Sequence, residues 1–387
     1  PSQILGSIKA DGRVYLINQN GIIFGGTSQI NVNTLIASTL DLDPSLTGSN
    51  YKAYLQGGLF QSSLPTGVTN GLNAAVFNQG NNGKIVVQPG AVIDTTGQVT
   101  SSGNGGYVAL LADGGISNAG SITTQNGQII LASGGAVTLV TPTASVVGVK
   151  TAMQVLTGRS ATPVAGSGVV RNETTGLLVS NDGAVTLAGG SISQLGAIVA
   201  TTSTTRTGSI ALSTLCQLGC GNGTDGNVVL GATSLTSILP DEASTTLPTS
   251  TVNSTTTANG TNGATAPYFQ QVLQPQINIS AQGNVDVQGS GAGLGGALIK
   301  APGAALTISA GSGGTTNAVL LEPGSTIDLS GIAGVTLPMS TNLVTFKITA
   351  AEVADTPLAQ GLIGQTVTID LRLSGTRADG FQWVGSP

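Results

Sequence analysis

Short runs of apolar, mostly β-branched residues recur along the chain, and each run is bounded by glycine or asparagine. Runs of this kind begin at Ile85, Ile129, Val185, Ile210 and Val228. Stretches with apolar residues at helical spacing are rare. Ser, Thr, Asn and Gly, which disfavour helix interiors, fill the gaps between the runs. The pattern therefore predicts many short β-strands separated by turns.

The spacing of these runs is regular. Three successive steps cover nearly the same length each time, from Ile8 to Ile30, from Ile85 to Val108 and from Val108 to Ile129. The runs concerned begin at Ile8, Val14, Ile22, Ile30, Ile85, Val92, Val99, Val108, Ile116, Ile122 and Ile129. A repeat of about 21 residues that contains three short strands is typical of a solenoid.

The repeat predicts an all-β architecture in which each coil has three strands. Equivalent strands of successive coils would pair in parallel about 4.8 Å apart. Alternate side chains would then point inward as aliphatic columns, while Thr, Ser, Asn and Gln face outward. Glycine and asparagine would occupy the corners, where a positive φ is often needed. The length would allow between about 10 and 14 coils.

Three regions interrupt the repeat. We expect residues 41–79 and 140–177 to be excursions from a first solenoid region that spans residues 1–233. Residues 234–275 are rich in Ser and Thr and predict a loop or linker. Further coils are expected over residues 276–340. Residues 341–387 read as the start of another module, and both ends of the sequence look cut from a longer protein.

Composition excludes several functions. Glycine accounts for 58 of 387 residues, which agrees with many corners. The chain has no His and two Cys, so His-based triads and zinc sites built on His or on several Cys are excluded. Twelve basic residues scattered over the chain cannot form a nucleic-acid-binding patch. We expect no cofactor and no metal site.

Residues 1–42 carry a series of short motifs. They begin with Pro-Ser-Gln-Ile-Leu-Gly at residues 1–6, followed by Asp11-Gly12. Asn18, Gln19, Asn20, Gly21 and Ile22 come next, and Ala37-Ser38-Thr39 ends the block. In this order the motifs resemble the secretion domain of two-partner-secretion exoproteins, the filamentous haemagglutinin family. Gln19 stands where that family usually has proline. Residues 345–387 are similar to a segment inside long members of the family.

The resemblance implies a right-handed parallel β-helix. It also implies secretion of the unfolded chain by a Gram-negative bacterium, through an outer-membrane β-barrel transporter. Members of the family act as adhesins, biofilm components or toxin stalks. The expected localisation is therefore extracellular or at the cell surface, and the expected partners are the transporter and host or bacterial surface glycans or proteins.

Two interpretations of residues 18–22 remain open. Asn-Gly favours a turn, so the motif can be a corner of the solenoid. The resemblance adds direct contact with the transporter as a role for Asn18, Gln19, Asn20, Gly21 and Ile22. The two roles are compatible.

Cys216 and Cys220 lie four residues apart in a glycine-rich segment. In an oxidising exterior a local disulfide between them is the favoured hypothesis. Free thiols are the alternative.

Carboxylates matter because parallel β-helices also carry polysaccharide-active enzymes, which need paired acids on adjacent coils. Asp94 and Asp113 are about one coil apart, and Asp286 and Asp328 about two. None of these carboxylates comes with a basic residue at coil spacing, so we expect a protein that is not an enzyme.

The sequence thus predicts a secreted rod that acts in surface adhesion or in a biofilm matrix. A self-assembling extracellular filament, built by end-to-end stacking of β-helical subunits, is the alternative. A polysaccharide-active enzyme on the same scaffold is the second alternative.

Overall fold

The structure is a computed structural model that describes residues 1–42, 74–78, 80–97, 105–140, 152–158, 168–203, 206–214, 226–241, 274–291, 295–311, 317–331, 343–351 and 353–386. The chain divides into two compact units. The first comprises Pro1–Thr245 and Val272–Gly331, and the second comprises Thr246–Gln271 and Ile332–Pro387. Each unit is described by itself.

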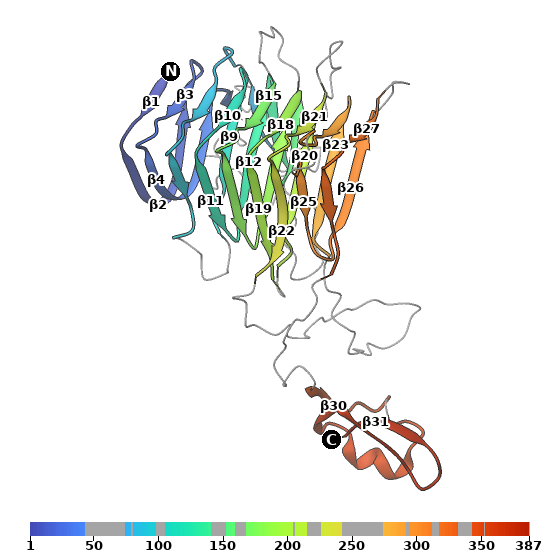
Figure 1. The fold of residues 1–387 in the computed structure, drawn as a ribbon. Helices are drawn as coiled ribbons and strands as arrows, with labels where there is room; N and C mark the ends of the chain where they lie inside the picture. Colours follow the sequence, from blue (N-terminus) through green and yellow to red (C-terminus); the bar gives the residue numbers. More distant parts are fainter. Residues whose placement is uncertain are drawn as a thin grey trace. The chain divides into compact units, whose positions relative to one another are not determined.

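Parallel strands form three faces in the first unit (Figure 1). The first, face A, is a nine-stranded sheet in which the strands pair in chain order. Its strands are β1 (Ser2–Ile4), β3 (Ile22–Phe24), β7 (Ile85–Val87), β10 (Ile116–Asn118), β15 (Val169–Asn172), β18 (Ser191–Gln194), β21 (Val228–Leu230), β24 (Val285–Val287) and β27 (Val319–Leu321).

Faces B and C belong to one 15-stranded sheet, because β2 (Ser7–Ile17) and β4 (Gln29–Ser38) run through both faces. Face B continues with β8 (Val92–Asp94), β11 (Ser121–Gln125), β16 (Leu177–Asn181), β19 (Ala197–Thr202), β22 (Leu235–Pro240), β25 (Leu298–Lys300) and β28 (Thr326–Asp328). Face C continues with β9 (Val108–Ala112), β12 (Gln128–Ser133), β17 (Ala184–Ala188), β20 (Ser209–Ser213), β23 (Gln276–Ala281) and β26 (Ala305–Ala310).

The three faces together give nine coils within the described residues, one for each strand of face A. The predicted parallel β-helix is therefore confirmed. This count, made on the described residues, lies below the expected range of about 10 to 14 coils. At about 4.8 Å per coil, the stack is about 40 Å long.

Strand registers test the predicted repeat directly. Ile8 pairs with Ile30, and Val108 pairs with Ile129, as the spacing predicts. The step from Ile85 to Val108 is wrong, because Ile85 pairs with Ile116 and Val108 is the third strand of the coil that begins at Ile85. The expected run at Val99 lies outside the described residues.

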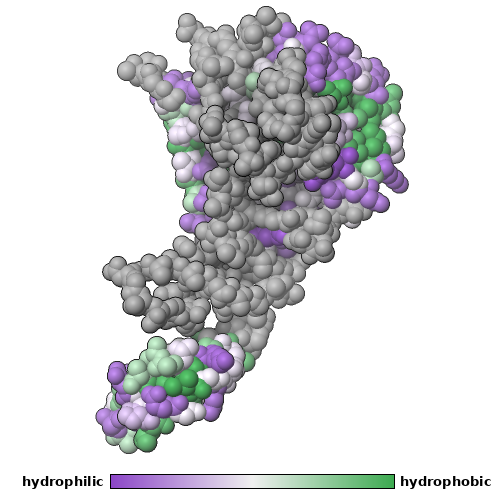
Figure 2. Space-filling model, turned by 180° about the vertical axis from the view of Figure 1, so that it is seen from behind, coloured by the Kyte–Doolittle hydropathy of each residue, from purple (hydrophilic) through white to green (hydrophobic). Residues whose placement is uncertain are grey.

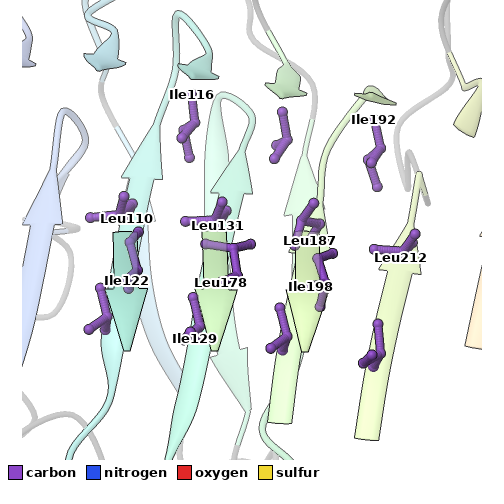
Figure 3. Close-up of a cluster of buried hydrophobic side chains, with 14 of the residues drawn as sticks. Leu110, Ile116, Ile122, Ile129, Leu131, Leu178, Leu187, Ile192, Ile198 and Leu212 are labelled. Carbon is purple, nitrogen blue, oxygen red and sulfur yellow. The ribbon is translucent and has the colours of Figure 1, made fainter. Parts of the chain in front are cut away.

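Aliphatic columns fill the interior. On face C, Leu110, Leu131, Leu187 and Leu212 occupy equivalent positions on four consecutive strands and are fully buried (Figure 3). Leucine and β-branched side chains at alternate positions suit such stacking, because each side chain packs on the equivalent side chain of the next coil. Burial of these columns supplies the main core of the β-helix.

One interior column changes from aliphatic to amide side chains in the middle of face A. Asn118 donates from Nδ2 to Asn172 Oδ1 over 2.8 Å, and Asn172 donates to Gln194 Oε1 over 2.9 Å. All three residues are buried. Since each amide bonds its neighbour along the stack, the ladder favours a single register between these coils.

A four-stranded flank sheet covers part of face C. It contains β5 (Asp41–Leu42), β6 (Ala74–Asn78), β13 (Ala136–Val140) and β14 (Gln154–Gly158), in the order β14-β13-β6-β5 with antiparallel pairing. It buries outward residues of face C in a second core. That core contains Ile36, Leu40, Phe77, Ala109, Leu111, Ile130, Ala132, Val137, Leu139 and Ala188.

Two of the expected interruptions are shorter in the structure than the sequence predicted. β15 and β16 lie within or at the end of residues 140–177 yet belong to the fifth coil, and β22 lies within residues 234–275 yet belongs to the seventh. In the sequence, polar residues at the outward positions of these strands obscure the alternation of residues that point inward. The expected excursion over residues 41–79 contributes β5 and β6 to the flank sheet, and residues 43–73 lie outside the described residues.

The second unit contains a small antiparallel sheet of β29 (Leu343–Lys347), β30 (Thr366–Thr376) and β31 (Gln382–Ser386), with a 3₁₀ helix over Pro357–Leu362. Hydrophobic side chains lie open on its surface (Figure 2), and among its described residues only Val353 is a buried hydrophobic residue. The separate module expected over residues 341–387 stays a prediction.

Candidate functional site

The predicted motif at residues 18–22 forms the turn between β2 and β3. Asn18 Oδ1 accepts a hydrogen bond from the Asn20 amide over 2.9 Å, and the Gly21 amide donates to the Asn18 carbonyl over 3.0 Å. Asn18 Nδ2 also donates to Ser2 Oγ over 2.7 Å. Asn18 therefore closes the turn and fixes the start of β1, which explains the need for a short amide side chain.

Gly21 and Ile22 also have structural roles. Gly21 has φ +109°, and an added Cβ would lie 3.0 Å from the Lys84 carbonyl oxygen, so only glycine fits. Ile22 is buried in the main core. By contrast, Gln19 is half-buried and Asn20 is exposed, so these two side chains are the part of the motif that faces outward.

The next coil places a second turn against the first, just before β7. The Ile22 amide donates to the Lys84 carbonyl over 2.9 Å. Gly83 lies so close that an added Cβ would be 2.3 Å from the Gln19 carbonyl oxygen. Asn81 Nδ2 donates to Asn20 Oδ1 through a long hydrogen bond of 3.4 Å, which joins the two turns at their exposed side.

A third turn follows before β10, and Asp113 anchors the second turn from it. Asp113 is 2% exposed, and its Oδ2 accepts from the Asn82 amide over 3.1 Å. Its own amide donates to Thr39 Oγ1, which in turn donates to the Gly83 carbonyl over 3.0 Å. The other carboxylate oxygen has no hydrogen-bond partner among the described residues.

We call residues 18–21, 81–84 and 113–115 the turn stack. It combines a corner of the β-helix with an exposed set of amides that come from two coils. Its exposed side chains are amides, which can both donate and accept hydrogen bonds.

The carboxylate pairs considered from the sequence do not come together. Asp94 is on β8 of face B, whereas Asp113 is buried in the turn stack. Asp286 is on face A and Asp328 on face B. The prediction that residues separated by a whole number of repeats lie close together is wrong for these pairs, because interruptions between the members of each pair shift the register.

A charged cluster that sequence reasoning missed lies at the corner after face B. Burial and the nearby Asp241 raise the pKa of Asp182, while the Thr201 hydroxyl and the Arg206 charge oppose the shift. Burial lowers the pKa of Arg206, and Asp182 opposes this. Asp182 also has φ +51°. Asp182 was not among the carboxylates considered from the sequence, although its separation from Arg206 along the chain is close to one repeat.

Cys216 and Cys220 lie outside the described residues, so the proposed disulfide stays a prediction. In the residues that the structure covers, no group of three or more Cys, Asp or Glu side chains could hold a metal ion. The same residues contain no helix that is long and apolar enough to cross a membrane.

The fold defines a class: an all-β, three-sided parallel solenoid with an antiparallel flank sheet. Comparison with family models then identifies its N-terminal part, because residues 1–161 match the model described as the TPS secretion domain. A comparison with curated proteins returned no match. The matched residues contain the whole turn stack and all four strands of the flank sheet.

Residues 1–161 therefore match a TPS secretion domain, and this match supports a two-partner-secretion exoprotein. The family resemblance found in the N-terminal motifs is confirmed at this level, and filamentous haemagglutinin fits within it. Such a domain implies a protein that Gram-negative bacteria export through an outer-membrane transporter.

Proposed function

We propose that this exported protein acts outside the cell as a stiff rod in surface adhesion or in a biofilm matrix. The observation that supports this role is the stack of nine coils in register, which joins every coil to the next by parallel strand pairing. Solenoids of this kind present extended, repetitive surfaces suited to binding.

The outward surface of the later coils supports the same role. On face C beyond the flank sheet, the outward residues include Ser213, Asn278, Ser280, Thr307 and Ser309. These side chains are uncharged hydroxyls and amides at least partly open to solvent. A flat polar surface without charge fits glycan or protein partners that are bound through hydrogen bonds.

The test compares attachment of cells that carry the gene, that lack it, and that lack it but receive purified full-length chain. We expect loss of attachment or biofilm mass in the deletion and recovery on addition of the purified chain. Equal attachment in all three cultures would overturn the proposal. A panel of polysaccharides assayed for new reducing ends checks the non-enzymatic part, and we expect no turnover.

A filament built by stacking is the second candidate, and the last coil favours it. β27 is an unpaired edge in the described structure, and its residues Val319, Leu320 and Leu321 are 42%, 52% and 52% exposed. An apolar strand edge of this kind readily pairs with another chain. Electron microscopy of the purified protein separates the two candidates, since isolated rods support the first and continuous filaments with a subunit repeat support the second.

We also propose that residues 18–22 contact the transporter during export, in addition to forming the corner. The supporting observation is that Gln19 and Asn20 face outward although the rest of the motif is used in the fold. Replacement of Asn18 and Asn20 by Ala should reduce the amount of protein in the medium. Unchanged export of this variant would remove the role.

A further inference from the structure

Face B changes from polar to apolar along the stack of coils. In the fourth coil its outward positions hold Ser121, Thr123 and Gln125. From the fifth to the eighth coil the outward positions are mainly apolar. We call six of these residues the apolar patch: Leu177, Val179, Ala197, Val199, Leu235 and Leu298. The strands that carry the patch are neighbours in the sheet, as β19, β22 and β25 show in Figure 1.

The apolar patch lies at the surface of the β-helix. Leu177 is 36% exposed, and the other five residues are each partly open to solvent. Their inward neighbours, among them Ile198 and Ile299, are fully buried, so the strands alternate between core and surface. No described strand covers this part of face B. On face C, apolar outward residues are the ones that the flank sheet covers.

The other two faces of the later coils have a different chemistry. On face A the outward residues include Arg171 and Asp286, which are charged. On face C they include Ser213 and Asn278, which carry a hydroxyl and an amide. The outward positions of β16, β19 and β22 on face B carry no charged residue. Face B is therefore the apolar side of these coils.

The polar side chains at the edge of the patch already have partners. Ser237 donates from Oγ to the Lys300 carbonyl over 2.9 Å. Lys300 is in register with Asp328 on the next strand, which carries the opposite charge. Covering the patch therefore leaves the Ser237 hydroxyl paired and places the Lys300 charge beside a balancing one.

We propose that the apolar patch is the centre of an interface with a second copy of this chain, in which two β-helices associate side by side with face B against face B. Exposed apolar patches mark interaction sites, and two sheets pack about 10 Å apart with their side chains interdigitated. A second copy has the same strand spacing along the same face, so its side chains match over several coils. The uncharged outward positions of β16, β19 and β22 also avoid repulsion between identical faces.

Two-fold symmetry determines which coils meet. An axis between the sixth and seventh coils lays the patch of one copy on the patch of the other and overlaps the fourth to ninth coils. Six strands about 4.8 Å apart and about 15 Å long give a footprint of roughly 400 Å² on each copy. Stable complexes bury roughly 600–1,000 Å² per partner. We therefore expect a weak dimer, with a Kd on the order of 10–100 μM.

This association differs from the end-to-end stacking considered above. Stacking uses the strand edge at β27, whereas the side-by-side contact uses outward side chains of the fifth to eighth coils. It leaves the strand edges as they are, so the two contacts can be broken separately.

The experiment measures sedimentation equilibrium of the purified full chain between about 2 and 200 μM. V199D and V199S alter the patch, and V199S gives the sixth coil the residue that the seventh has in register, Ser237. A211D is the matched control, because Ala211 is an outward, partly open residue on face C of the same coil. L320D alters the exposed edge strand β27. Circular dichroism and urea unfolding check that each variant is folded.

We expect the wild type, A211D and L320D to dimerise alike toward the top of this range. V199D should raise the Kd at least about tenfold, because it brings two carboxylates together in an apolar contact. V199S should raise it about threefold, because it removes apolar area.

A wild type that stays monomeric at about 200 μM would overturn the proposal. So would equal dimerisation of V199D and A211D. Association that L320D abolishes and V199D leaves intact would assign the contact to end-to-end stacking instead. If V199D does not fold, the comparison of V199S with A211D decides in the same way.

Discussion

Face C of the β-helix has two halves that differ in what covers their outward side chains. In the second to fifth coils its outward residues lie under the flank sheet, and Ile36, Leu111 and Ile130 are fully buried. In the sixth to eighth coils the equivalent positions are at least partly open, and they hold residues such as Ser213 and Ser280. The inward residues are aliphatic throughout both halves. Alternating apolar residues therefore indicate which side chains fill the interior of the β-helix. Apolar residues at the outward positions as well indicate that a second layer of strands covers that face.

The largest difference should come from placing a charge at one outward position in each half. Leu111 and Ser280 belong to the same outward column, and Leu111 is fully buried by the flank sheet. L111D would bury an unpaired carboxylate and should lower the free energy of unfolding by about 3–5 kcal/mol. S280D should change it by less than about 0.5 kcal/mol. Urea unfolding measures both, and equal effects would show that the flank sheet does not cover this position.

Interior truncations should not distinguish the two halves. Leu131 lies beneath the flank sheet and Leu212 beyond it, in one inward column, and both are fully buried. L131A and L212A should each cost about 2–5 kcal/mol, since each loses aliphatic contacts and leaves a cavity. The same unfolding assay applies. A cost below about 1 kcal/mol for L212A alone would mean that the later coils lack a packed interior.

A smaller effect is expected where the flank sheet is fastened to the β-helix. Gln128 accepts from the Met153 amide over 2.8 Å, and its Nε2 donates to the Met153 carbonyl and to Thr186 Oγ1. Q128A leaves these groups unpaired and should cost about 1–3 kcal/mol. Hydrogen exchange should also become faster in β14.

The matched control is Q276A, because Gln276 occupies the same column on the seventh coil and is exposed. It should leave both stability and exchange unchanged. Unaltered exchange of β14 in Q128A would contradict the fastening role.

The smallest effect concerns pH and the charged corner of face B, which carries no flank sheet. Because the pKa of Asp182 is raised in the folded protein, the folded state binds its proton more tightly than the unfolded state does. Its contribution to stability is therefore greatest below the unfolded value of 3.8 and is lost as the pH rises through the folded value. The melting temperature of D182N relative to wild type should be higher at pH 7 than at pH 4. An equal difference at both values would contradict the assignment.

The sequence predicted the parts of the fold that depend on local alternation. The register between Ile8 and Ile30 followed from their spacing, because no interruption lies between them. The register of Ile85 was predicted wrongly, because Val108 was counted as the start of the next coil, whereas it begins the third strand of the coil that starts at Ile85. The excursion over residues 41–79 was predicted, but the antiparallel sheet that its strands β5 and β6 join was not, although apolar residues at the outward positions of Ile36 and Leu111 indicated a covering layer.

The candidate site was predicted in part. Asn-Gly at residues 20 and 21 identified the turn, and the structure assigns the corner role to Asn18, Gly21 and Ile22. The approach of Asn81 and Asp113 could not be predicted, because spacing does not reveal which coil follows an interruption of uncertain length. The pair of Asp182 and Arg206 could have been found, since their separation is close to one repeat.

The central claim is that this β-helical chain leaves the cell through a dedicated outer-membrane transporter. The most direct measurement compares the amount of full-length chain in the medium of cells with and without the transporter gene. The account predicts that the protein appears in the medium only when the transporter is present. Equal amounts in both cultures would contradict it.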